Sequence, residues 1–182
     1  MKTSRAKITL IALGALGIVA AGCSSPVSGT PQPDKPASSA ATPKSGNPFA
    51  ARNQCALLDQ ILTGQGFPKA TPTVAQPERA CASQKPSVGT ERGMDVSLFL
   101  QEDRLYTDTV PHPETARRGD INGRPSIEEP EPQNSPGQCD ITMAVEPHSR
   151  ASLLVTTSLD TKTACAAAEK YATAVEPLLP KN

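Results

Sequence analysis

Two stretches of the chain repeat apolar residues at helical spacing, one near residue 55 and one near the C-terminus. Before the first stretch stands Asn53, a residue type that caps helices, and after it Gly64 can end a helix. The second stretch can be capped by Asp160 or Thr161, and Pro177 would stop it. The apolar faces consist of Cys55, Leu57, Leu58, Ile61 and Leu62 in the first, and of Cys165, Ala168, Ala172 and Val175 in the second. We therefore predict an N-terminal and a C-terminal helix.

Between these helices, apolar residues alternate with polar ones, which is typical of half-buried strands. Residues 151–157 are rich in Leu, Val and Thr and follow a turn-like segment at 146–149, so they predict a hairpin with the strand before them. Shorter strand patterns lie at 80–83 and at 119–127, where the turn dipeptide Asn122-Gly123 interrupts the second. The clearest alternations are Met94, Val96, Leu98 and Leu100, and Ile141, Met143 and Val145. The order of helix, strands and helix predicts an α+β domain, an antiparallel β-sheet with both helices packed on one face.

The first 22 residues have the pattern of a signal peptide. Lys2, Arg5 and Lys7 form a basic segment, and residues 8–21 after it carry no charge. The apolar stretch is about 14 residues long, whereas a membrane-spanning helix needs roughly 20. We therefore expect residues 1–22 to be removed on export.

The sequence Val19-Ala20-Ala21-Gly22-Cys23 resembles a bacterial lipobox. That resemblance implies that the Cys23 thiol becomes lipidated, so the mature chain would be anchored through Cys23 at the outer, extracytoplasmic face of the cell membrane. The alternative is an ordinary signal peptide followed by an unrelated cysteine.

A tether and a single domain follow Cys23. Residues 23–50 are dominated by Ser, Pro, Ala, Thr and Gly and show no periodic apolar face, so they cannot bury enough surface to fold. Flexible-chain scaling gives this tether a reach of roughly 30 Å, and an extended polyproline form roughly 80 Å. Residues 51–182 have the usual size of one domain.

Charge and composition narrow the function. The signal peptide holds three of the 18 basic residues and none of the 18 acidic ones, so the mature chain has a small acidic excess. This charge argues against a nucleic-acid partner. Three Phe, two Tyr and no Trp leave little ring surface for stacking against sugars, so carbohydrate binding is disfavoured.

With Cys23 assigned to lipid, four cysteines remain, and an even number outside the cytoplasm indicates two disulfides. Of the three possible pairings we favour Cys55–Cys81 and Cys139–Cys165, which would each tie a terminal helix to a strand. A metal site is disfavoured because no CxxC spacing occurs. A cysteine nucleophile would need a histidine, and only His112 and His148 exist, both in turn-like contexts. We expect no metal, no cofactor and no catalytic residue of this kind.

An acidic segment contains Glu128, Glu129 and Glu131. Calcium loops place their oxygens around a turn, whereas Pro130 and Pro132 hold this segment extended. We therefore expect a solvated acidic loop here. The folded part also contains no Gly-x-Ser-x-Gly elbow, Gly-rich phosphate loop or Ser-x-x-Lys motif, which lowers the expectation of enzymatic activity.

Charged residues crowd the long connection at 101–120, and long loops often carry recognition sites. We select Asp108, His112, Arg117 and Arg118 as candidate recognition residues. The alternative for each of them is a solvated connection.

Several short motifs together resemble a known family. They are Cys-x-Leu-Leu at Cys55, Gly-Arg-Pro-Ser at 123–126, Cys-x-Ile-x-Met at 139–143, and a final Cys-x-x-Ala helix that ends in Leu-Leu-Pro. With the lipobox and the tether, they are similar to actinobacterial lipoproteins that carry a domain of unknown function, including mycobacterial Lpr-type relatives. The resemblance implies a cell-surface location and paired cysteines, and it supplies no activity. Ser83 stands where a Trp is common in that family.

We therefore expect a non-enzymatic, lipid-anchored binding or accessory module that acts on an envelope protein or a small ligand. One alternative is a cell-envelope enzyme with a site in the 101–120 loop. The other is a carrier of an apolar or lipid-like ligand.

Overall fold

A computed structural model of the chain describes residues 46–181, except 76–77, 109 and 146–147. The predicted signal peptide, Cys23 and the predicted tether up to residue 45 lie outside the described residues, so these predictions remain open. No helix in the described ranges is long and apolar enough to cross a membrane.

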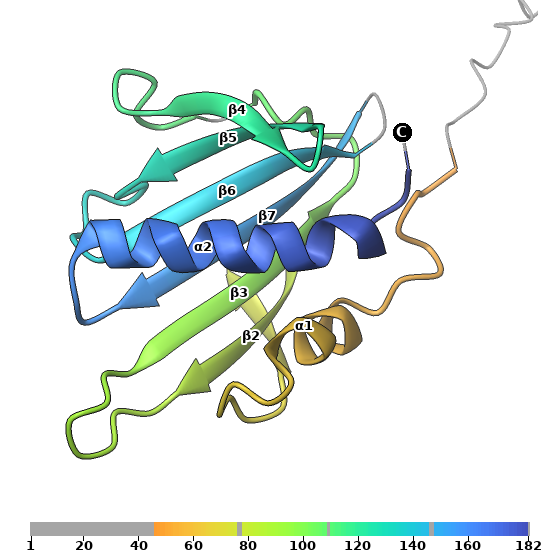
Figure 1. Cartoon of the computed structure of the whole chain (residues 1–182). Helices are drawn as coiled ribbons and strands as arrows, with labels where there is room; N and C mark the ends of the chain where they lie inside the picture. The colour runs from red at the N-terminus through yellow and green to blue at the C-terminus, as the bar shows by residue number, and fades with distance from the viewer. Residues whose placement is uncertain (1–45, 76–77, 109, 146–147, 182) are drawn as a thin grey trace, which may run out of the picture. The chain divides into compact units, whose positions relative to one another are not determined.

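One seven-stranded sheet, entirely antiparallel, forms the centre of the domain (Figure 1). Its order is β1-β2-β3-β7-β6-β5-β4, so two runs of neighbouring strands meet where β3 pairs with β7. The elements are α1 (Gln54–Leu62), β1 (Thr71–Ala75), β2 (Glu78–Lys85), β3 (Met94–Gln101), β4 (Arg117–Ile121), β5 (Arg124–Pro130), β6 (Gln138–Val145), β7 (Ser149–Thr157), α2 (Thr161–Val175) and the short 3₁₀ helix η1 (Glu176–Leu178).

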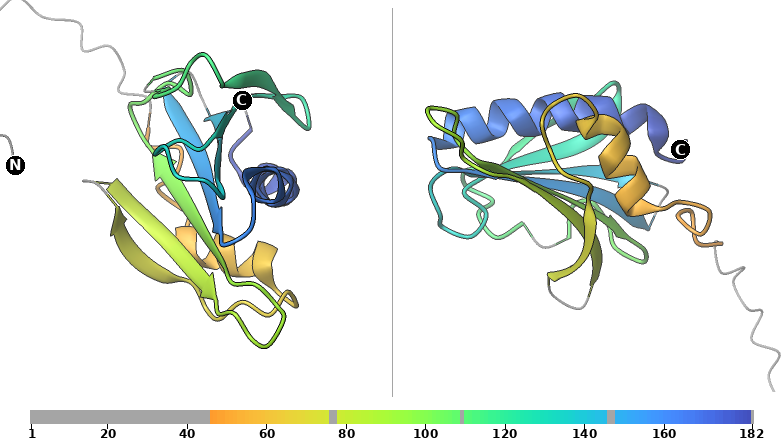
Figure 2. Two further views of the ribbon diagram at one scale, coloured as in Figure 1. Left: turned by 90° about the vertical axis from the view of Figure 1, so that its left-hand side faces the viewer. Right: turned by 90° about the horizontal axis from the view of Figure 1, so that it is seen from below.

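Both helices pack on the same face of the sheet, as the order of helix, strands and helix predicted (Figure 2). Helix α1 lies against β2 and β3, and α2 lies against β6 and β7. The side chain of Asn53 accepts a hydrogen bond from the Ala56 N–H at 3.0 Å, and that of Asp160 accepts one from Thr163 at 2.9 Å. These contacts confirm Asn53 as the N-cap of α1. They also show that Asp160, and not Thr161, is the N-cap of α2.

The core lies between the helices and the sheet. Its strand side is a set of alternate residues that face the helices, and cross-strand pairs such as Val96–Val155 and Leu98–Leu153 continue from one strand to the next. From α1, Leu58 enters this core, and from α2, Val175 does so. The side chains with almost no exposed surface are Leu58, Leu98, Met143, Leu153, Val96, Val145, Val155, Val175 and Cys139.

The two disulfides connect Cys55 with Cys81 and Cys139 with Cys165, and both pairings are those predicted from the sequence. Cys55 and Cys165 stand near the start of the two helices, and their partners stand on β2 and β6. Each bridge therefore fastens a helix to the sheet face that it covers.

One strand was missed, and two predictions about the strands were wrong. The edge strand β1 was not foreseen, because its sequence Thr-Pro-Thr-Val-Ala shows no apolar alternation. The predicted acidic loop is in fact largely strand β5, in which Glu129 is buried with 6% of its surface exposed. Arg117 and Arg118, which were assigned to a loop, are the first two residues of β4. Ser83 donates a hydrogen bond to the Pro68 carbonyl at 2.6 Å.

Candidate functional site

The face of the sheet opposite the helices, here called the open face, carries a group of polar side chains at its centre. Strand alternation places these residues there, because each stands next to a residue that faces the core. Three cross-strand pairs make up the group: Glu129 with Asp140, Thr142 with Ser152, and Gln101 with Arg150. We call these six residues the open-face cluster. Five of them are buried to nine-tenths or more, namely Gln101, Glu129, Thr142, Arg150 and Ser152, and Asp140 is half-buried.

Residues 102–116 without residue 109, here called the covering loop, contact two members of this cluster, Arg150 and Glu129. The loop connects β3 to β4 and lies on the side of the sheet away from the helices (Figure 2, right). Within it, the Leu105 N–H donates to the Asp108 carboxylate at 2.9 Å, and the Asp108 N–H donates to the Leu105 carbonyl at 3.0 Å. These reciprocal bonds give the first half of the loop a defined turn.

Two cluster residues hold the covering loop against the sheet. The guanidinium of Arg150 donates to the backbone carbonyls of Leu105 and Asp108, and also to the side chain of Gln101. The carboxylate of Glu129 accepts a hydrogen bond from the His112 N–H at 2.9 Å. Because buried charged groups form strong hydrogen bonds, both contacts fix the loop in place.

A chain of hydroxyl groups ends on the Asp140 carboxylate. Thr142 Oγ1 donates to Asp140 at 2.8 Å and lies 2.7 Å from Ser152 Oγ. Since a threonine hydroxyl has one proton, Ser152 must be the donor to Thr142 when Asp140 is ionised. When Asp140 is ionised, the hydrogen bonds therefore run in one direction, from Ser152 through Thr142 to the Asp140 carboxylate.

The pKa of Asp140 is raised to about 6, chiefly by burial of the carboxyl group and in part by the neighbouring Glu129 carboxylate. The hydrogen bond from Thr142 and the charge of Arg150 act in the opposite direction and lower it. Asp140 therefore exchanges its proton near neutral pH, unlike an exposed aspartate. The charge of the open-face cluster therefore changes by one unit when Asp140 gains or loses its proton.

The four predicted recognition residues do not form one group. Asp108 and His112 lie in the covering loop and contact the cluster through their backbones. The register of β4 puts Arg118 on the open face as well, at an exposed position opposite Ile127. Arg117 lies on the other face, where it forms an ion pair of 2.7 Å with Glu128. Whether any of them contacts a ligand stays a prediction.

Asp140, Thr142, Arg150 and Ser152 were not predicted from the sequence as site residues. Each is a polar residue between core residues, a pattern that ordinarily marks a solvated sheet face. Only the position of the covering loop distinguishes them from surface residues.

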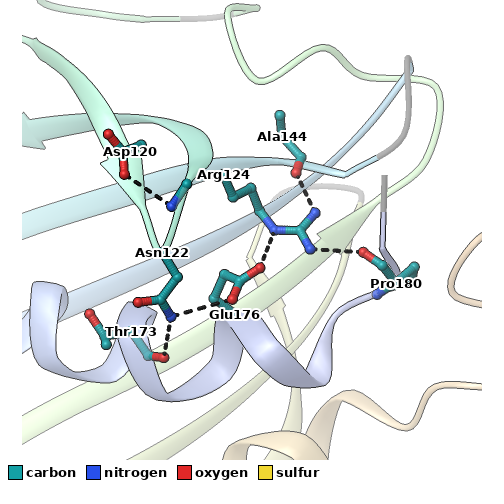
Figure 3. Close-up of polar contacts among 8 residues, drawn as sticks. Asp120, Asn122, Arg124, Ala144, Thr173, Glu176 and Pro180 are labelled. Atoms are coloured by element: carbon teal, nitrogen blue, oxygen red, sulfur yellow. Dashed lines mark hydrogen bonds and ion pairs between the residues drawn. The ribbon is translucent and has the colours of Figure 1, made fainter.

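A second set of polar contacts surrounds Arg124, in the Gly-Arg-Pro-Ser motif (Figure 3). Its guanidinium is buried and donates to Glu176 Oε1 at 3.0 Å, to the Ala144 carbonyl at 2.8 Å and to the Pro180 carbonyl at 2.9 Å. The preceding Asn122 donates to the Thr173 carbonyl at 3.2 Å. These contacts join β5, β6 and the end of the chain, so the motif has a structural role.

One group of side chains has the spacing of a metal site but not the chemistry. Glu128 lies close to the sulfurs of Cys139 and Cys165, with ligand atoms within 4.8 Å of one another. Because the two sulfurs form a disulfide, neither is the thiolate that a metal would need. A surface hollow of about 380 Å³ next to this disulfide also contains Arg117 and Glu169.

No curated protein and no solved structure shows significant similarity to the chain. A family model, in contrast, matches almost its whole length, from residue 18 to residue 178. The chain therefore belongs to the family of proteins of unknown function named DUF3558.

Proposed function

We propose that the chain is a lipid-anchored binding module at the extracytoplasmic face of the membrane, and that the covering loop on the open face is its recognition surface. The observation that carries this proposal is the attachment of the loop to Arg150 and Glu129. A long loop held in one conformation by buried groups suits binding, because little of its freedom is lost when a partner docks.

Several features support the proposed compartment and anchor. Two disulfides are typical of domains that fold outside the cytoplasm. The family match begins at Ile18 and so includes Cys23. Membership of the actinobacterial, Lpr-type lipoproteins belongs to the same proposal and rests on the lipobox and the short motifs.

The packing of the core disfavours a carrier, and the covered position of the hydroxyl groups disfavours an enzyme. Leu58, Leu98 and Leu153 fill the space between helices and sheet, where a carrier would hold its ligand. The hydroxyls of Thr142 and Ser152 are covered and bonded to each other, so they do not face a substrate cleft.

Charge favours a basic partner. The covering loop contains four carboxylates, those of Glu102, Asp103, Asp108 and Glu114, against the single guanidinium of Arg104. Among these charges Leu105 exposes 40% of its surface. We infer an envelope protein or peptide that presents an apolar side chain flanked by basic residues.

The anchor is tested by Cys23→Ser in the chain with its own leader. We expect the wild type to fractionate with the membrane and to carry a diacylglyceryl mass on its N-terminal peptide, and the variant to be released without that mass. A variant that stays with the membrane would contradict the lipid anchor.

The recognition surface is tested by placing a photoreactive amino acid at Leu105 of the anchored chain in intact cells. The matched control carries it at Val88, an apolar residue with 66% exposure in the β2–β3 hairpin. We expect a discrete cross-linked partner from position 105 only, and its loss when Glu129→Ala detaches the loop. Equal labelling from both positions, or labelling that Glu129→Ala leaves unchanged, would refute the proposed surface.

A further inference from the structure

Strand β4 is an edge of the sheet and pairs only with β5 (Figure 1). Within the described residues, no backbone hydrogen bond outside the β4–β5 ladder involves residues 117–121. Its sequence is Arg-Arg-Gly-Asp-Ile, and the first four residues are exposed. Unpaired backbone groups on such an edge can accept another strand.

The structure of a single chain does not explain why position 119, at the centre of β4, is a glycine. Its φ is not positive, so the backbone does not require glycine there, and a methyl group would meet nothing within 4 Å. Glycine in a strand costs about 0.5–1 kcal/mol relative to alanine. A glycine of this kind often marks a place where another backbone approaches closely.

We propose that β4 pairs antiparallel with β4 of a second copy of this chain, with Gly119 opposite Gly119 on the twofold axis. In that register Arg118 of each copy stands opposite Asp120 of the other, so the pair forms twice. Opposite charges at directly facing positions stabilise a sheet. The surface is thus complementary to itself, as a twofold interface must be.

Neighbouring registers are disfavoured by the same charges. Centring the pairing on residue 118 sets two arginines against each other, and centring it on residue 120 sets two aspartates against each other. Because facing residues in an antiparallel pair share one side of the sheet, Arg118 and Asp120 meet on the open face. The two recognition surfaces would then lie on the same face of one continuous sheet.

This pairing is independent of the proposed function and is tested by Gly119→Cys in the full chain, exported with its own leader. On the twofold axis the two new thiols face each other, so we expect a covalent dimer on a non-reducing gel. Thr71→Cys, which is exposed on the opposite edge strand β1, is the matched control and should give less than about a tenth of that dimer. Peptide mapping of the two native disulfides verifies that both variants fold.

Charge exchange separates specific pairing from chance encounter. Adding Arg118→Asp to Gly119→Cys sets aspartate against aspartate, and the dimer should fall at least about tenfold. Adding Asp120→Arg as well restores opposite charges and should restore the dimer. A Gly119→Cys dimer no stronger than the control, or one that neither charge change affects, would overturn the proposal.

Discussion

Glu129 and Asp140 face each other across β5 and β6, and the covering loop lies over the pair. One carboxylate holds the loop through the His112 N–H, while the other accepts the hydroxyl of Thr142. The two acidic residues therefore have separate tasks, and each can be tested by itself.

The first prediction concerns Asp140 and pH. Its pKa in the folded protein, about 6, exceeds its ordinary value of 3.8, so the folded state binds the proton more tightly than the unfolded state. The resulting stability is fully present below about pH 4 and is lost as the pH rises through 6, by an amount on the order of 3 kcal/mol.

Asp140→Asn removes this loss, because asparagine stays neutral and can still accept from Thr142. We expect urea unfolding to show nearly equal stability of variant and wild type at about pH 4, and a more stable variant at about pH 8. A stability difference that is the same at both pH values would contradict the raised pKa.

The second prediction concerns the attachment of the loop. Glu129→Ala removes the acceptor of the His112 N–H, and an unsatisfied buried donor costs about 1–3 kcal/mol. Local opening should then speed tryptic cleavage after Arg104 by about tenfold. Glu129→Gln is the control, since it also removes the charge but keeps an oxygen acceptor, and it should leave the rate near that of the wild type. Equal acceleration by both variants would mean that the charge, and not the hydrogen bond, holds the loop.

The third prediction compares two Arg→Lys substitutions. The three guanidinium nitrogens of Arg124 donate to three different acceptors, and the single ammonium group of a lysine can replace only some of these hydrogen bonds. We expect Arg124→Lys to lower the free energy of unfolding by about 2–4 kcal/mol. Arg117→Lys alters an ion pair whose arginine is 71% exposed, and it should change stability by less than about 1 kcal/mol. Urea titration measures both, and equal effects would refute the structural role of Arg124.

The fourth prediction concerns the disulfides. Both bridges span 26 residues, so the chain-entropy model gives the same contribution for each, on the order of 3.5 kcal/mol. Replacing either cysteine pair with alanine should therefore lower the free energy of unfolding by a similar amount. Hydrogen exchange should show increased opening of α1 in the Cys55/Cys81 variant and of α2 in the Cys139/Cys165 variant. Opening of the other helix instead would contradict the separate attachment of the two helices.

Local chemistry allowed much of the fold to be predicted. Period-two alternation at Met94 to Leu100 and at Ile141 to Val145 identified β3 and β6, because one side of each strand is buried. Asn122-Gly123 identified the β4–β5 turn, where both residues have the positive φ that this turn needs. The disulfide pairing was favoured among three possibilities because it ties each terminal helix to a neighbouring strand, and the structure confirms it.

The contacts of the candidate site could not be predicted from local sequence patterns. Asp108 and His112 were selected for being in a long charged connection, and nothing in their neighbourhood indicated what they would contact. Glu129 was assigned to solvent because its flanking prolines suggest an extended loop, yet an extended segment can also form a strand. Its cross-strand partner Asp140 is 11 residues away along the chain, and His112, whose N–H donates to Glu129, is 17 residues away.

The sequence by itself determined which side chains alternate along β3 and β6 and approximately where the two helices lie, because both patterns depend on near neighbours along the chain. Only the tertiary structure decided which polar face is covered. The covering loop connects β3 to β4 but is held by Glu129 of β5 and Arg150 of β7, and a sequence does not reveal which backbone carbonyls a side chain such as Arg150 will contact. The open edge at β4 is likewise a consequence of strand order, which is set by long-range pairing.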